Sequence, residues 1–424
     1  MAACTIQKSC RDGIGWSAVE LGDVRHLFAT AIPRRGATLA EEARDALETI
    51  AGAVCDEGDR RSIVHQAVFV ADPSRIDECR RIIHDFYGSD LPATTYIPQP
   101  PCDGRLLAIE ALGVGRGRGE VEIERISPQL VIARHNGIAW IHCAQIVPPM
   151  CAAGVYEGTI SAFTQMRSLL AGADAQFHQV IRTWLYLGGI VEDEGGTQRY
   201  RELNRARSDF YRGIPFLADR LPADFPGMAY PASTGIGTEG RKLMLSAIAL
   251  ATDRRDIVAV PLENPRQTAA FDYPGHYSPQ SPKFSRAVAL SCGDYATIFI
   301  SGTASVTASE TQHVGDAAAQ THATLDNIAA LIGEENLSRH GLPGLGTSLD
   351  GLGLVRVYVK RPADFARTRA VCRQRLGELP VVYAMADVCR SDLLVEIEGI
   401  AFSRKEPSPA GPGVPHFTGE FAAK

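Results

Sequence analysis

The sequence has 424 residues, 45% of them hydrophobic, with a net charge of −6 and a pI of about 6.0. This length suggests two to three domains with ample buried core. The charge does not favour a nucleic-acid partner, which would require a basic stripe. No apolar run reaches the ~20 residues of a membrane span, and residues 1–16 lack a signal-peptide pattern. We therefore expect a cytoplasmic protein without a membrane partner.

The ten cysteines do not form a recognisable metal site or disulfide framework. They include no CxxC pair, and no Cys/His cluster has the spacing of zinc ligands. Several lie inside apolar stretches, as Cys143 does. We interpret most of them as buried thiols in a reducing compartment.

One order of elements occurs three times along the chain. Each copy begins with a short apolar strand, followed by a helix with apolar residues three to four positions apart. A strand rich in β-branched or aromatic residues comes next, then a helix with one charged face, a strand that starts at a proline, and a last strand. In this order the predicted elements lie near 26–29, 43–54, 63–70, 76–86, 92–94 and 106–114 in the first copy; 138–141, 163–170, 180–187, 200–211, 231–233 and 243–250 in the second; and 298–301, 321–332, 354–359, 363–376, 380–382 and 393–401 in the third.

Strands interleaved with helices predict an α/β (α+β) fold. A lobe of this size covers one face of its sheet with two helices and leaves the other face apolar and bare. Two further copies in the same chain would cover it, so we expect three lobes in an intramolecular pseudo-trimer, with sheets inside and helices outside. The predicted divisions are lobe 1 (15–120, degenerate), lobe 2 (127–256), an ordered connector (257–287), lobe 3 (288–404) and a loosely held tail (405–424).

Comparing the three lobes with one another singles out one acidic residue. Aligning Ile397 with Ile109 and Leu245 places Glu396 opposite Ala108 and Met244, so only lobe 3 has an acid there. A carboxyl facing an apolar cleft has a raised pKa and can act as a general acid at neutral pH. The alternative is a salt-bridged strand residue at the surface. Glu398 has a counterpart in Glu110, and we interpret it as structural.

The third lobe resembles the RidA/YjgF (endoribonuclease L-PSP) family, whose lobe is chorismate mutase-like. The resemblance rests on four segments: 299–302 (FISG), 314–316 (VGD), 320–328 with its Gln-Thr helix start, and 395–401 (VEIEGIA). That family forms trimers with sites in the clefts between subunits. The resemblance therefore implies that this chain is similar to a whole trimer fused into one polypeptide.

Residues 128–402 resemble a more specific group within that superfamily, the chorismatases. About a dozen short segments match in order, among them 182–187, 199–207, 231–238, 262–267, 273–287, 300–305, 313–316 and 389–396. The sequence departs from the family pattern at Leu185, Ala206 and Val191, which we expect near the substrate.

The resemblance implies hydrolysis of the enol ether of chorismate, or of a related enolpyruvyl acid. Pyruvate would leave, together with a dihydroxycyclohexadiene acid or hydroxybenzoate. Glu396 would protonate the methylene carbon, and Cys389 matches the position that separates the two product branches. No metal or organic cofactor is implied. The expected partner is a small carboxylic acid, and the expected assembly is a monomer or a dimer of pseudo-trimers.

The candidate substrate ligands come from lobes 2 and 3. A dicarboxylate needs cationic or N–H donors, and glycines let backbone N–H groups approach a ligand. The candidates are Arg207, Tyr200, Tyr211, Thr234, Gly235, Gly302, Thr303, Ala304, Tyr358 and Arg390. Simpler interpretations stay open: a solvated helix face for Arg207, ordinary packing for Tyr358 and Cys389, and common turn glycines.

Two other functions remain as alternatives. One is a RidA-type enamine or imine deaminase. Such enzymes depend on an arginine two residues after the proline of the fifth element, where this chain has Thr94, Ser233 and Val382. The other is a non-catalytic pseudo-trimer that binds a small acid, whose cleft around Glu396 would be filled or blocked.

Overall fold

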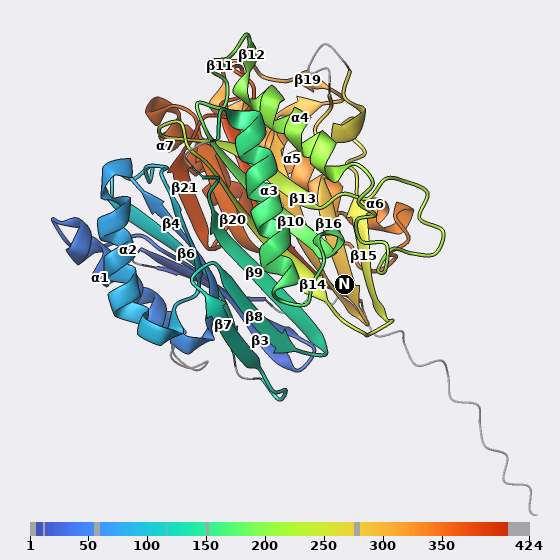
Figure 1. The fold of residues 1–424 in the computed structure, drawn as a ribbon, viewed down its shortest axis with the longest axis horizontal. Helices are drawn as coiled ribbons and strands as arrows, with labels where there is room; N and C mark the ends of the chain where they lie inside the picture. The colour runs from blue at the N-terminus through green and yellow to red at the C-terminus, as the bar shows by residue number, and fades with distance from the viewer. Residues whose placement is uncertain are drawn as a thin grey trace, which may run out of the picture.

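The computed structural model describes residues 6–11, 13–54, 60–115, 117–149, 152–274 and 280–405. Within these residues the longer strands form three six-stranded sheets, one for each lobe (Figure 1). All three sheets have the same strand order, which confirms the α/β fold class and the triple repeat. None of the described helices is long and apolar enough to cross a membrane.

Lobe 1 contains the first sheet and two long helices. The sheet order is β1-β2-β3-β6-β4-β5. Its elements are β1 (Ile6–Arg11), β2 (Ile14–Leu21), β3 (Val24–Ala31), α1 (Leu39–Ala53), β4 (Ile63–Val70), α2 (Ile76–Tyr87), β5 (Ala93–Ile97) and β6 (Leu107–Gly115). Thr38 caps α1, because its side chain accepts from the backbone N–H of Glu41, whose carboxylate accepts from the N–H of Thr38 in return. This reciprocal pairing fixes where the helix begins.

Lobe 2 repeats this arrangement in the order β7-β8-β9-β14-β10-β13. Its elements are β7 (Glu122–Ser127), β8 (Leu130–His135), β9 (Ile138–Ile146), α3 (Val155–Ala171), β10 (Val180–Gly188), the short strands β11 (Asp193–Glu194) and β12 (Thr197–Gln198), α4 (Arg199–Tyr211), β13 (Ala232–Thr238) and β14 (Leu243–Ala251). Strand β13 pairs in parallel with β10 and forms the edge of this sheet.

Lobe 3 has the order β15-β16-β17-β22-β20-β21. Its elements are β15 (Ile257–Leu262), β16 (Ala287–Cys292), β17 (Tyr295–Ala304), the short strands β18 (Val306–Thr307) and β19 (Glu310–Thr311), α5 (Ala317–Ile332), α6 (Glu334–Arg339), β20 (Leu352–Val359), α7 (Phe365–Leu376), β21 (Val381–Met385) and β22 (Val395–Arg404). The Asp316 carboxylate caps α5 by accepting from the N–H of Ala319 at 3.0 Å.

The structure differs from the sequence prediction at the start of each lobe. The antiparallel strand pairs β1 and β2, β7 and β8, and β15 and β16 were not predicted. The first two pairs are hairpins, whereas residues 263–286 separate β15 from β16. Residues 257–262 were assigned to the connector but pair with β16, so they belong to the sheet of lobe 3. The short helix α6 was also missed. Residues 406–424 of the predicted tail lie outside the described residues.

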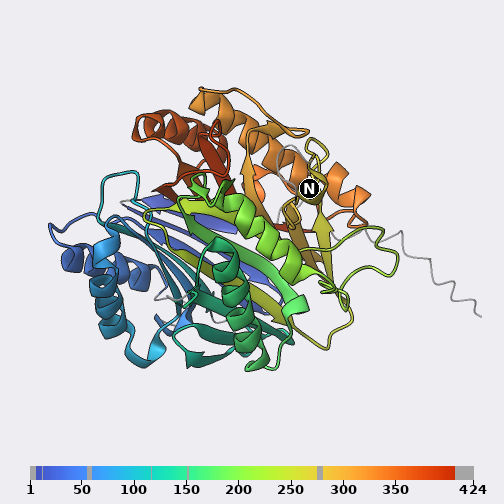
Figure 2. The same ribbon diagram turned by 45° about the horizontal axis from the view of Figure 1, so that its top comes forward.

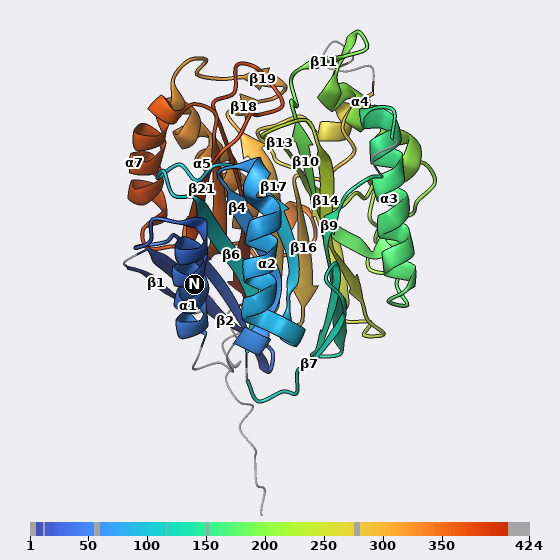
Figure 3. The same cartoon turned by 60° about the vertical axis from the view of Figure 1, so that its left-hand side comes forward.

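The three sheets face the centre of the molecule and the helices lie outside them (Figures 2 and 3). In Figure 3 α1 and α2, α3 and α4, and α5 and α7 form three peripheral pairs around the strands. Aromatic side chains from different lobes meet between the sheets: the rings of Phe28 and Phe402 lie 5.3 Å apart, and those of Trp140 and Phe299 lie 6.3 Å apart. Each lobe thus covers the apolar sheet face that its neighbours leave bare.

Four histidines lie in this central interface. The rings of His26 and His135 are 4.9 Å apart, and those of His65 and His142 are 5.5 Å apart. Both ring nitrogens of His135, and Nδ1 of His65 and of His142, are buried without a hydrogen-bond partner among the described residues. Burial lowers the pKa of His135 to about 4 and, with a smaller contribution from His135, that of His142 to about 3. These histidines are therefore neutral in the folded protein.

We predict that acid destabilises the fold through these histidines. Below about pH 6.5, their ordinary pKa, the unfolded chain binds protons that the folded chain does not, so the free energy of unfolding falls as the pH falls from about 6.5 towards 4. Each neutral histidine contributes a slope of about 1.4 kcal/mol per pH unit. Chemical denaturation at a series of pH values measures this slope. His135→Phe should reduce the slope by about 1.4 kcal/mol per pH unit, because one neutral histidine is removed. A slope equal to that of the unchanged protein would contradict the assignment.

Candidate active site

Strand pairing confirms which residues are equivalent in the three lobes. Glu396 pairs across the sheet with Tyr358 of β20, Met244 pairs with Tyr186 of β10, and Ala108 pairs with Phe69 of β4. Each of the three therefore occupies the same point on the last strand of its lobe. Glu396 is the acid that lobes 1 and 2 lack at this point.

Glu396 lies at a cavity of about 630 Å³ between lobes 2 and 3. This volume suits a small organic ligand. Lobe 2 contributes side chains from α4 and β13, and lobe 3 contributes β17, the loop before β22, and β22 itself. The cavity is lined by Gln198, Tyr200, Arg201, Asn204, Arg207, Ser233, Gly235, Gln267, Tyr273, Pro282, Phe284, Arg286, Gly302, Ala304, Val306, Glu310, Thr311, Val314, Cys389, Arg390, Ser391, Asp392, Leu393 and Glu396.

A glycine on β17 makes room for the Glu396 carboxyl. The pairing between β17 and β22 is irregular between Ile300 and Thr303, which places Gly302 beside Glu396. A Cβ atom at residue 302 would lie 2.1 Å from Oε1 of Glu396. Gly235 has a similar role on β13, since a Cβ there would lie 2.9 Å from the ring of Tyr200. Both glycines are needed for close packing rather than for an unusual backbone conformation.

The environment of Glu396 favours its protonated form. Burial, and then the negative charge of Glu398, raise the pKa of Glu396 to about 8, against smaller opposing effects of Arg182 and Arg286. The side chain is 5% exposed. At neutral pH the cavity therefore contains a neutral carboxylic acid that can donate a proton.

Glu398 lies two residues further along the same strand and has a different environment. Its carboxylate is paired with Arg182 and lies 3.1 Å from the Arg356 guanidinium. Trp184 donates to it at 2.9 Å and Tyr358 at 3.0 Å, and Thr234 also donates. Burial alone would raise the pKa of Glu398, but the two arginines and these donors hold it below its usual range. Glu398 is therefore ionised, and this agrees with its interpretation as structural.

Two buried arginines supply positive charge to the cavity. Arg207 of α4 is 1% exposed and donates to Asn204 at 2.5 Å. Arg286, just before β16, is 4% exposed and donates to the backbone oxygen of Thr268 at 2.9 Å and to the hydroxyl of Tyr273 at 2.5 Å. The two guanidinium groups each lie 5.5 Å from the ring of Phe284, and neither forms an ion pair with a described carboxylate. They can therefore bind an anion.

The structure brings eight of the twelve predicted site residues to the cavity: Tyr200, Arg207, Gly235, Gly302, Ala304, Cys389, Arg390 and Glu396. The burial of Arg207 excludes the simpler interpretation of a solvated helix face. Burial, followed by the charge of Glu396, raises the pKa of Cys389 to about 12, so its thiol stays protonated. Cys389 is thus suited to shaping the cavity rather than to nucleophilic attack.

The other four predicted residues lie away from the cavity lining. Thr234 and Tyr358 donate to Glu398, and Thr234 also accepts from the N–H of Gly302 at 2.9 Å. The hydroxyl of Thr303 donates to the backbone oxygen of Ser301, and Tyr211 packs against Phe216 at 4.7 Å. Thr234 thereby connects lobes 2 and 3 behind the site, whereas the Tyr358 hydrogen bond lies within lobe 3. The unusual residues Leu185, Ala206 and Val191, expected near the substrate, are also absent from the cavity lining.

Arg286 was not predicted as a site residue. It belongs to the connector, and neither strand nor helix periodicity marks that segment. One signal was present: an arginine directly before the apolar strand β16, in a segment that matches the family. Gln267, Tyr273 and Phe284 come from the same connector, which thus forms one wall of the cavity.

In the equivalent cleft between lobes 1 and 2, a side chain takes the place of the glycine. Between lobes 1 and 2, Gln145 stands where Gly302 stands in lobe 3, and its side chain accepts from the N–H of Tyr96 at 2.7 Å. Between lobes 1 and 3, the chain near Pro100 pairs with β21, since Pro100 accepts from the N–H of Met385 at 2.7 Å. Beside the last strand of lobe 3, by contrast, the cavity at Glu396 measures about 630 Å³.

The comparisons with known proteins identify the family. Residues 118–249 match the family described as "Chorismatase FkbO/Hyg5-like, N-terminal". A 3-hydroxybenzoate synthase of Streptomyces hygroscopicus is 36% identical over 278 residues, which cover 62% of this chain and 76% of that protein. The chain belongs to the chorismatase family.

Two further chorismatases support this assignment. The chorismatase of Streptomyces rapamycinicus is 37% identical over 276 residues, which cover 63% of this chain and 77% of that protein. A chorismatase crystal structure superposes with a TM-score of 0.62 and 26% identity, covering 81% of this chain and 94% of that one. The family profile named N-terminal matches lobe 2, so lobe 1 lies before the segment that the profile matches.

We predict that Gly302→Ala disturbs the site without unfolding the protein. Its Cβ forces the Glu396 carboxyl to move, and overpacking of this kind costs about 1–3 kcal/mol. Gly52→Ala, within α1, is a matched control, because nothing lies within 4 Å of a Cβ there. It should leave stability equal or raise it, since alanine favours a helix. Equilibrium unfolding measures both, and a Gly302→Ala protein as stable as the Gly52→Ala protein would show that the predicted contact is absent.

Proposed function

We propose that this chain hydrolyses the enol ether of chorismate, releasing pyruvate and a six-membered ring acid. The observation that carries this proposal is a protonated buried acid, Glu396, facing a cavity with two unpaired buried arginines. The relatives named chorismatase and 3-hydroxybenzoate synthase support the choice of substrate. The chain thus acts as a small-molecule enzyme, and the reaction needs only proton transfer and water.

The charges of the cavity suit this substrate. Chorismate has two carboxylates, one on the ring and one on the enolpyruvyl group, and Arg207 and Arg286 supply two buried cations. The Phe284 ring is close to both guanidinium groups and offers a flat apolar surface to the ring of the substrate. If the two arginines bind the two carboxylates of chorismate, its enol ether would be held close to the Glu396 carboxyl.

The proposed reaction begins with proton transfer from Glu396 to the methylene carbon of the enolpyruvyl group. Positive charge then develops at the ether carbon, and water adds there while its proton returns to Glu396. The hemiketal collapses as its hydroxyl proton passes to the ring oxygen and the bond between the ether carbon and that oxygen breaks. The products are pyruvate and a dihydroxycyclohexadiene acid, and loss of one water from the latter gives hydroxybenzoate.

Glu396 acts as the acid in this reaction, and Glu398 stays ionised as a neighbouring anion. An acid that donates at neutral pH needs a raised pKa, and its neighbour must stay ionised to help raise it. The pKa of Glu396 is raised to about 8, and that of Glu398 is held below its usual range by Arg182 and Arg356. The two residues are separated by one position on β22 and differ only in their partners.

Two alternatives have less support. A RidA-type deaminase would need an arginine where this chain has Thr94, Ser233 and Val382, and these three residues are buried within the fold. A non-catalytic binding protein would have a blocked cleft at Glu396, whereas the cavity there measures about 630 Å³.

We predict that Glu396→Gln abolishes pyruvate release from chorismate. Glutamine fills the same volume but cannot donate the proton, and loss of a general acid lowers the rate by about 10²–10⁴-fold. A coupled assay with lactate dehydrogenase and NADH measures pyruvate directly. Glu378→Gln, which changes an exposed acid in the same lobe, is the control and should keep full activity. Pyruvate release by Glu396→Gln at the control rate would refute the assignment.

The pH dependence of the reaction is a separate prediction. Because burial and Glu398 raise the pKa of Glu396 to about 8, the acid stays protonated through neutral pH, and kcat/KM should fall tenfold per pH unit above about 8. An ordinary carboxyl would instead lose activity above about pH 4.5. A rate profile between pH 4 and 10 separates the two, and a fall in kcat/KM that begins near pH 4.5 would show that Glu396 is not desolvated.

A last prediction concerns the product. The resemblance places Cys389 at the position that separates the aromatic branch from the diene branch, and its protonated thiol faces the cavity. Cys389→Ala should therefore keep pyruvate release while changing the ratio of hydroxybenzoate to dihydroxycyclohexadiene acid. Liquid chromatography of the products measures this ratio, and an unchanged ratio would exclude control by Cys389.

A further inference from the structure

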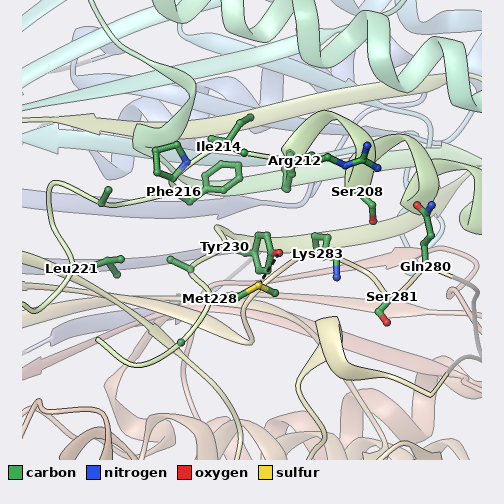
Figure 4. A pocket seen from close by; sticks show the side chains of 16 residues that line it. Ser208, Arg212, Ile214, Phe216, Leu221, Met228, Tyr230, Gln280, Ser281 and Lys283 are labelled. Carbon is green, nitrogen blue, oxygen red and sulfur yellow. Dashed lines mark hydrogen bonds between the residues drawn. The ribbon is translucent and has the colours of Figure 1, made fainter. Parts of the chain in front are cut away.

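A second cavity of about 730 Å³ lies in lobe 2, beside the end of the connector (Figure 4). It is lined by Ser208, Tyr211, Arg212, Gly213, Ile214, Pro215, Phe216, Ala218, Leu221, Gly227, Met228, Ala229, Tyr230, Gln280, Ser281 and Lys283. None of these residues lines the cavity at Glu396. We call this second space the outer cavity.

The outer cavity has an apolar side and a polar side. Figure 4 shows Ile214, Phe216 and Leu221 gathered at one end, and Ser208, Gln280, Ser281 and Lys283 at the other. The apolar end continues into an aromatic cluster, in which the ring of Phe216 lies 4.7 Å from that of Tyr211 and 6.2 Å from that of Tyr230. Such a surface accommodates a flat ring.

The charges of the outer cavity are all positive. Its lining contains Arg212 and Lys283 and no acidic residue. Arg212 donates to Asp209 at 2.7 Å, outside the lining, whereas the Lys283 ammonium forms no ion pair with a described carboxylate. Burial, and to a smaller extent Arg207, lower the pKa of Lys283, while the nearby Asp272 opposes this effect. A carboxylate bound in the outer cavity would favour the charged form further.

The polar end also contains a hydroxyl without a partner. Oγ of Ser208 is buried and forms no hydrogen bond within the described part of the chain. A buried hydroxyl of this kind costs free energy unless a ligand or water satisfies it. Ser208 and Lys283 thus offer a donor and a cation at the same end of the cavity.

The outer cavity and the cavity at Glu396 share their dividing wall. Arg207 lines the inner cavity while the next residue, Ser208, lines the outer one. In the connector, Pro282 and Phe284 face the inner cavity and Lys283, between them, faces the outer one. Residues 207–208 and residues 282–284 therefore line both cavities, with neighbouring side chains facing opposite sides of the wall.

We propose that the outer cavity is a second binding site, for a ring that carries a single carboxylate. The ring would pack against the aromatic end, and the carboxylate would bind Lys283 and Ser208. The choice of hydroxybenzoate as ligand rests on the proposed function, because this acid is a product expected from the inner cavity. The site itself does not depend on turnover, since its charge and shape are independent of Glu396.

Equilibrium dialysis with radiolabelled 3-hydroxybenzoate tests this proposal, and we expect two molecules bound per chain. Lys283→Met removes the cation and should weaken the outer site at least tenfold, and Met228→Asp should do the same by adding a negative charge at an exposed position of the lining. Lys242→Met, which removes an exposed lysine elsewhere in lobe 2, is the matched control. Arg207→Met should weaken the other, inner site instead.

Each outcome of this experiment is decisive. One molecule bound per chain and lost in Arg207→Met, or two molecules whose affinity neither Lys283→Met nor Met228→Asp changes, overturns the proposal. Binding of the neutral 3-hydroxybenzamide as tightly as the acid would also overturn it, because the carboxylate would then contribute nothing. If chorismate releases no pyruvate while the outer site still binds 3-hydroxybenzoate, the proposed function fails and this inference stands.

Discussion

The buried charge cluster around Glu398 is the interaction on which the rest of the structure depends. Glu398 belongs to lobe 3, Arg182 to lobe 2, and Arg356 joins Glu398 to Glu110 of lobe 1. Arg356 also donates to Tyr186 of lobe 2 at 2.9 Å. Removing one member of such a cluster leaves an uncompensated buried charge, at a cost of about 3–5 kcal/mol. The cluster therefore fixes how the three lobes meet, which the apolar sheet faces alone would not specify.

The same cluster sets the chemistry of Glu396. Because Arg182 and Arg356 keep Glu398 ionised, a fixed negative charge stands beside Glu396 and adds to the effect of burial on its pKa. Thr234 links this cluster to the cavity, because it donates to Glu398 and accepts from the N–H of Gly302. Gly302 in turn lies next to the Glu396 carboxyl. The same network therefore holds the lobes together and contributes to the raised pKa of Glu396.

The sequence predicted the repeated core of the fold well, because hydrophobic periodicity reports which face of an element is buried. It also identified Glu396 through comparison of the lobes, and the strand register supports that alignment at each position. It missed the antiparallel strand pairs that begin each lobe. It also missed Arg286, because the connector has no regular pattern, and its place at the cavity depends on tertiary contacts with Thr268 and Tyr273. Thr234 and Tyr358 were predicted as substrate ligands, but they donate to Glu398 instead of lining the cavity. A sequence does not distinguish a side chain that faces the cavity from one that faces Glu398 behind it.

Lobe 1 shows why a copy without a site is nevertheless needed. It has Ala108 where lobe 3 has its acid, and its cleft with lobe 2 is filled by Gln145. Its Glu110, however, receives two hydrogen bonds from Arg356, at 2.8 and 2.5 Å, and so holds that guanidinium in place beside Glu398. Without Glu110, the positive charge of Arg356 would lack one of its two carboxylate partners in a fully buried position. Lobe 1 thus affects Glu396 through the charge of Glu398, because one electrostatic network couples the three lobes.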